Sequence, residues 1–174
     1  MKYCLCFVIL CLLAALSCAR ANLPSDAVAP RDRTLVVWAH SDIQPNDPFE
    51  KIQYETAVRD IGTLPFVPDA AIVAGDLVHR LDSQTYWDWM KGLRVKTKIP
   101  LWFEIAGNHD LNDYGSYRRN SGKPRHYAVR CGNILFIFLS DEIRSAITEI
   151  SDAAFEWWKD LVVNNRDSII VTVS

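Results

Sequence analysis

The sequence lacks a surplus of charge of either sign, since 19 Lys and Arg residues stand against 21 Asp and Glu residues and the net charge is −2. A basic surface that holds nucleic acid or an anionic membrane is therefore not expected. If the chain binds phosphate, local groups or metal ions must attract it. A hydrophobic content of 49% in 174 residues is enough for one globular domain with its own core.

Cysteine is also scarce, because four of the five cysteines lie within the first 18 residues and Cys131 is the fifth. If those N-terminal residues are removed from the mature protein, one cysteine remains. A single cysteine cannot form an internal disulfide, so a fold held together by disulfides is then excluded. Cys131 lies in an apolar stretch, which predicts an inert, buried thiol and not a nucleophile.

The N-terminal residues differ in composition from the rest of the chain. Lys2 precedes an uncharged apolar run over residues 4–16, and this run is shorter than the roughly 20 residues that a membrane-spanning helix needs. We predict a signal peptide over residues 1–21 and hence an exported protein, secreted or periplasmic, with no transmembrane span after signal removal. Lipid attachment at Cys18 is the alternative, since the residues before it form a loose lipoprotein box.

After this segment, residues 22–33 are rich in proline and charge and predict an exposed leader, and residues 34–174 are predicted to be the domain. Apolar runs alternate there with amphipathic segments, which indicates an α/β layer structure. Ligands of such folds are usually held at the carboxyl ends of the strands. The predicted strands are 34–39, 70–74, 100–106, an antiparallel pair 126–130 and 134–140, and 168–173; the predicted helices are 48–61, 83–92 and 151–163.

Three of the predicted core strands end in polar residues that burial alone would not select. Hard divalent cations bind carboxylate and amide oxygens, imidazole suits iron, zinc and manganese, and one carboxylate can bridge two ions that activate a water between them. Each motif alone is common, but three strand ends of this kind in order point to a metal site. The motifs are Asp42-Ile43-Gln44, Gly75-Asp76 and Gly107-Asn108-His109-Asp110.

In order and approximate spacing, these residues resemble the first three sequence blocks of the calcineurin-like metallophosphoesterases, and the likeness extends from about residue 34 to the end. The resemblance implies an α/β fold, a layered metallophosphoesterase-like β-sandwich flanked by helices, and two divalent metal ions. It also implies that Asp42 binds the first ion, Asp76 bridges both and Asn108 binds the second. His109 would contact the phosphate and either stabilise the charge of the transition state or protonate the leaving oxygen, and Asp110 would orient or tune His109.

The sequence departs from the family pattern at two points. Gln44 stands where the first block usually has histidine; because its carbonyl oxygen is a harder ligand, manganese or magnesium is favoured, with iron or zinc as alternatives. Some branches of the family that resemble manganese-dependent diphosphatases also carry glutamine here. The later histidine blocks have no counterpart, since no histidine follows His126. We therefore expect a domain truncated after about half of its length.

The segment after the third motif is basic and aromatic, and its candidate substrate-binding residues are Tyr114, Arg118 and Arg119. They could hold a phosphate or stack on a base, and a solvated loop is an equally good interpretation. For His79, a surface or helix-start position is favoured over a place in the site.

The predicted function is hydrolysis of a phosphoester or phosphoanhydride by a dinuclear metal centre, with a phosphorylated small molecule or a phosphoprotein as substrate. The alternative is a binding or scaffold module of the same fold with weak or no turnover. A receiver domain or aspartyl-phosphate phosphatase is disfavoured, because the Asp42 motif lacks the second carboxylate that such sites place near the nucleophile.

Overall fold

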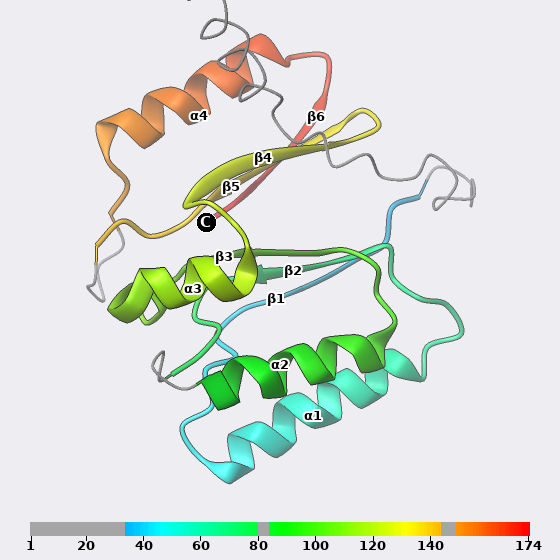
Figure 1. Ribbon diagram of the computed structural model, residues 1–174. Coiled ribbons are helices and arrows are strands. Elements are labelled where there is room, and N and C mark those ends of the chain that lie inside the picture. Colours follow the sequence, from blue (N-terminus) through cyan, green and yellow to red (C-terminus); the bar gives the residue numbers. More distant parts are fainter. Residues whose placement is uncertain (1–33, 80–83, 144–148) are drawn as a thin grey trace, which may run out of the picture. The chain divides into compact units, whose positions relative to one another are not determined.

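The computed structural model describes residues 34–79, 84–143 and 149–174 (Figure 1). The predicted signal peptide and the predicted leader lie outside the described residues. The chain from Leu35 to Ser174 forms one unit, a mixed α/β structure with two three-stranded sheets and four α-helices among the described residues. No helix in these described ranges is both long and apolar enough to cross a bilayer.

The first sheet contains β1 (Val37–His40), β2 (Ala70–Ala74) and β3 (Trp102–Ile105), in the order β1-β2-β3. Both pairs of neighbouring strands are parallel, in agreement with the alternation of strands and helices along the sequence. All three strands therefore end at the same edge of the sheet.

The second sheet contains β4 (His126–Cys131), β5 (Ile134–Leu139) and β6 (Ile169–Val173). β4 and β5 pair antiparallel, as predicted, and β6 pairs parallel to β5. Helix α4 (Asp152–Asn164) precedes β6 and is capped by Ser151, whose side chain accepts a hydrogen bond from the Ala154 backbone N–H.

Apolar clusters cover both faces of the first sheet. Successive side chains of a strand point to opposite sides, so β2 and β3 each contribute residues to both clusters. On one face, Val73 of β2 packs with residues of α1 (Pro48–Gly62) and α2 (Gln84–Thr97), among them Trp87 and Met90. On the other face, Ile72 and Phe103 pack in one cluster with Phe136 and Phe138 of β5. Apolar side chains thus join the two sheets, and the full sandwich of the family stays a prediction.

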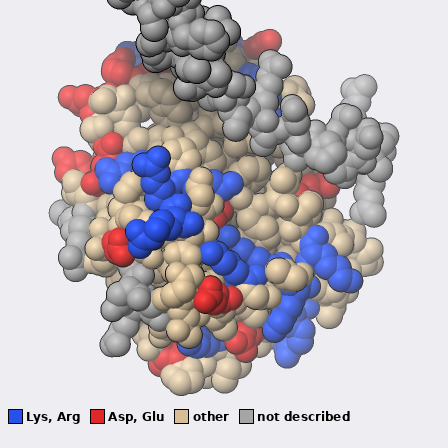
Figure 2. Space-filling view, in the orientation of Figure 1, with Lys and Arg blue, Asp and Glu red and all other residues tan. Residues whose placement is uncertain are grey.

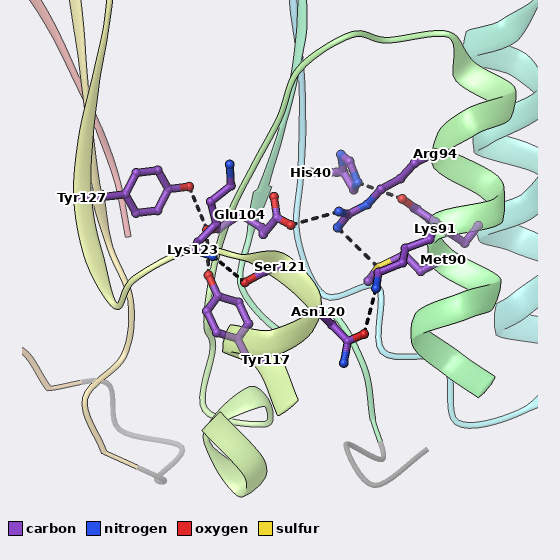
Figure 3. A network of polar contacts seen from close by, with 11 residues as sticks. His40, Met90, Lys91, Arg94, Glu104, Tyr117, Asn120, Ser121, Lys123 and Tyr127 are labelled. Atoms are coloured by element: carbon purple, nitrogen blue, oxygen red, sulfur yellow. Dashed lines mark hydrogen bonds and ion pairs between the residues drawn. The ribbon is translucent and has the colours of Figure 1, made fainter. Parts of the chain in front are cut away.

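Helix α2 is longer than predicted, because it does not end at Gly92 but continues to Thr97. Its last turns are held by tertiary contacts that outweigh the low helix propensity of glycine. Leu93 is buried, and the Arg94 guanidinium forms an ion pair of 2.9 Å with the buried carboxylate of Glu104 on β3. Figure 3 shows this pair within a polar network between α2 and β3.

The polar loop predicted after the third motif contains helical structure: the 3-10 helix η1 (Asp110–Asp113) and helix α3 (Tyr114–Ser121). Asp113 caps α3 by accepting a hydrogen bond from the Ser116 N–H. Tyr117 is fully buried, and its hydroxyl donates to the Glu104 backbone carbonyl at 2.9 Å. One buried aromatic side chain therefore fixes a segment whose composition is that of a loop.

Candidate functional site

The three predicted motifs begin within two residues of the ends of β1, β2 and β3, and backbone hydrogen bonds tie their segments together. The Asp42 N–H donates to the Gly75 carbonyl at 3.3 Å, and the Gln44 N–H donates to the Asp76 carbonyl at 3.1 Å. The Asp76 carboxylate accepts the His109 backbone N–H at 2.9 Å. The structure thus brings the motifs together at the carboxyl edge of the first sheet.

The backbone at this edge is unusually close-packed. A Cβ atom on Gly107 would lie 2.2 Å from Asp76 Oδ1, and one on Gly75, whose φ is +82°, would lie 3.0 Å from the Gly107 Cα. Only glycine fits at both positions. Asp42 and Asp76 themselves have φ values of 53° and 52°, a left-handed conformation that costs an aspartate about 1 kcal/mol or more and that clusters at functional sites.

Asp110 is fully buried beneath these segments and holds two of them together. Its carboxylate accepts hydrogen bonds from the Leu77 N–H at 3.1 Å and from the Gly107 N–H at 2.9 Å. Burial, with a smaller contribution from the charge of Asp76, raises the pKa of Asp110 to about 7. These contacts assign Asp110 a role in holding the backbone; its effect on the His109 ring remains a prediction.

The candidate metal ligands differ in exposure. Asp42 is exposed, Gln44 and Asn108 are half-buried, and Asp76 is 9% exposed. The Gln44 side-chain oxygen is buried and has no hydrogen-bond partner among the described residues. A buried oxygen without a donor is unusual, and a hard cation would satisfy it. In this respect the residues fit a divalent metal ion.

Carboxylates and imidazoles alone do not form such a site. Within the described ranges, no three His, Cys, Asp or Glu side chains lie close enough together to hold a metal ion. Any ion bound here would therefore depend on the amide oxygens of Gln44 and Asn108. This dependence favours ions that accept oxygen ligands.

A cavity of about 410 Å³ lies beside the first motif and is lined by residues of the β1–α1 segment, among them Asp42, Gln44 and Tyr54. His40 also lines it, with its ring 4.2 Å from that of Trp38 and its Nε2 3.2 Å from the Tyr54 hydroxyl. Burial, with a smaller effect from the charge of Arg94, lowers the pKa of His40 to about 4. His40 is accordingly a neutral packing residue.

The second sheet contributes two residues that the sequence analysis missed, Ser140 and Asp141, which follow β5. The Ser140 hydroxyl accepts the Ala106 N–H at 2.9 Å, and the Asp141 N–H donates to the Ala106 carbonyl at 2.9 Å. Burial and the charge of Asp76 raise the pKa of Asp141, whereas a hydrogen bond from the Asn108 backbone lowers it. The rule that polar residues after buried strands form sites would have identified both.

The candidate substrate-binding residues lie on α3, where basic side chains gather on the face shown in Figure 2. Arg118 and Arg119 are exposed, and Arg119 lies 3.8 Å from the Asp113 carboxylate. Tyr114 is half-buried, stacks on Tyr117 and lies under the Arg125 guanidinium. Their substrate-binding role stays a prediction.

The family comparison agrees with the motifs at the sheet edge. The model of the calcineurin-like phosphoesterase family matches residues 35–173, which is most of the chain. No curated protein matches the sequence. Members of this family typically hydrolyse phosphoesters and usually bind two divalent metal ions. On the family match and the geometry of its strand ends, the chain belongs to the calcineurin-like phosphoesterase family.

Proposed function

We propose that the protein hydrolyses a phosphoester or phosphoanhydride with the help of two divalent metal ions. The observation that carries the proposal is the junction of the three strand-end segments, where the Asp76 carboxylate accepts the His109 N–H and Gln44 donates to the Asp76 carbonyl. Family membership supports the reaction class. The substrate would be a phosphorylated small molecule or a phosphoprotein.

Each polar residue at the edge has a proposed part in binding the ions. Asp42 and Gln44 would hold the first ion, Asn108 the second, and Asp76, which lies between the other two segments, would contact both. The unpartnered Gln44 oxygen supports its assignment as a ligand. Because two of these four ligands are amides, manganese or magnesium is preferred to zinc.

His109 is the proposed acid–base residue. When bound, the two ions supply the positive charge that polarises the phosphoryl group and activates water. His109 would then donate a proton to the leaving oxygen or stabilise its developing charge. The Asp76 carboxylate accepts the His109 backbone N–H at 2.9 Å, and the Asp110 carboxylate accepts the Gly107 backbone N–H at 2.9 Å. Two carboxylates therefore hold the backbone of the segment that carries the imidazole.

Substrate selection and localisation are proposed from the sequence. Arg118 and Arg119 are exposed on α3, where their guanidinium groups are able to hold a phosphate, and Tyr114 supplies an aromatic ring beside them. We also propose export, with the signal peptide removed, or attachment through Cys18.

A second candidate function is a binding or scaffold module of the same fold. It is favoured by Gln44 in place of a histidine and by the lack of a carboxylate and imidazole cluster among the described residues. The experiment that separates the two is release of product from an aryl phosphodiester by the purified chain with added Mn²⁺. Hydrolysis that EDTA abolishes and Mn²⁺ restores supports the enzyme; metal binding without hydrolysis supports the module.

A further inference from the structure

His79 lies three residues after Asp76, in the segment that follows β2, and is half-buried. Its sequence position favours a surface or helix-start histidine, but the structure places its ring against that of His109. The two ring centroids are 5.5 Å apart and the ring planes are tilted by 36°. Since β2 and β3 are neighbouring parallel strands, the segments after them deliver two imidazoles to one place.

One ring nitrogen of His79 is left without a hydrogen bond to the described part of the protein. Its Nδ1 is buried and has no hydrogen-bond partner in the described part of the chain, and its contact with His109 is a contact between rings. The Nδ1 atoms of His40 and His126 are also buried without a partner in these described ranges, so this feature alone does not single out His79. What sets His79 apart is the contact of its ring with that of His109.

The charges around the pair indicate what kind of ligand this is. Asp42, Asp76 and Asp141 carry carboxylates on the segments at this edge, and carboxylates accept hydrogen bonds but repel an oxyanion. Imidazole N–H groups are the complementary donors. The site is therefore divided into an oxygen-rich part that suits cations and an imidazole part that suits a phosphoryl oxygen.

We propose that His79 is a second substrate-contacting imidazole, which donates a hydrogen bond from a ring N–H to a phosphoryl oxygen beside His109. This inference rests on the proposed function and extends it by one residue. The ligand class is a tetrahedral phosphate ester or its product, inorganic phosphate. His79 binds the oxyanion, and the metal ions are held by the other residues.

Histidine NMR tests the contact directly, because the chain has only four histidines. The full chain, labelled at the imidazole nitrogens and loaded with diamagnetic Mg²⁺, is titrated with inorganic phosphate. The ring signals of His79 and His109 should shift with one common Kd. His126, which contacts Glu142 at 3.0 Å, should not shift. A His79 signal that completes its shift with Mg²⁺ alone would make His79 a metal ligand and overturn the inference.

Two substitutions measure what the contact contributes. His79→Leu removes the donor and should raise the Kd of phosphate and lower kcat/KM for an aryl phosphodiester by about 10–100-fold, the usual contribution of one hydrogen bond to a charged group, with bound metal unchanged. His79→Gln keeps an N–H donor and should recover part of the loss. His126→Gln is the matched control, a half-buried histidine outside the pair, and should change neither value by more than about twofold.

The outcomes separate this inference from the proposed function. If the chain hydrolyses the diester and phosphate shifts His109 but not His79, the inference is wrong and the proposed function stands. If neither ring responds and no ester is hydrolysed, both fail. The titration of the unmodified chain does not depend on whether a His79 variant folds.

Discussion

Replacing Glu104 by alanine should destabilise the fold by about 3–5 kcal/mol, the cost of leaving a buried charge without its partner. The Glu104 side chain is 2% exposed and that of Arg94 is 13% exposed, and their nearest atoms are 2.9 Å apart. The Arg94 guanidinium also lies 4.8 Å from the centroid of the Trp102 ring. After Glu104→Ala, this cation would stay largely out of water with no carboxylate beside it.

The double variant Arg94→Met and Glu104→Leu is the matched control. It removes both charges and retains similar volume, so it should cost much less than Glu104→Ala, about 1–2 kcal/mol or less. Both free energies of unfolding are obtained from urea denaturation followed by the fluorescence of the six tryptophans. A loss below about 1 kcal/mol for Glu104→Ala would refute the reasoning, because it would mean that Arg94 is solvated without its partner.

Three further predictions concern the sheet edge. Gly107→Ala places a Cβ atom 2.2 Å from Asp76 Oδ1, so it should displace that carboxylate and lower the metal content measured by atomic emission. Gly92→Ala is the control and should leave the metal content unchanged, because a Cβ atom there meets open space. Gln44→His should shift the metal preference of the hydrolysis from manganese toward zinc; unchanged metal-reconstitution curves would contradict the ligand role. Asp110→Asn should lower the free energy of unfolding by about 1–3 kcal/mol, because one carboxylate oxygen becomes an NH2 group, which cannot accept the Leu77 N–H that now lies 3.2 Å and 3.1 Å from the two oxygens; an unchanged urea midpoint would contradict the backbone-holding role.

The sequence predicts a strand or helix correctly where the hydrophobic pattern of that segment alone specifies the element. The strand β2, for example, is an unbroken apolar run between turn residues, and Gly75-Asp76 follows it directly. Neighbouring parallel strands end at the same edge of a sheet. The order of strands and helices in the sequence therefore also predicts that the segments with Asp42, Asp76 and Asn108 lie together.

Other features depend on contacts between distant residues, which periodicity does not report. α3 forms in a polar segment because Tyr117 is buried and bonds to Glu104. α2 continues past Gly92 because Arg94 pairs with the same residue. The place of His79 beside His109 depends on how two loops meet, and a single histidine in a sequence does not reveal it.

The central claim, a two-metal phosphoesterase site at the carboxyl edge of the first sheet, is tested most directly by measuring bound metal and kcat together in the full chain and two variants. Asp76→Asn should lose metal and turnover together, because it removes the charge proposed to contact both ions. His109→Ala should keep its metal and lose about 10²–10⁴-fold in kcat. Full activity of Asp76→Asn with an aryl phosphodiester and Mn²⁺ would contradict the account.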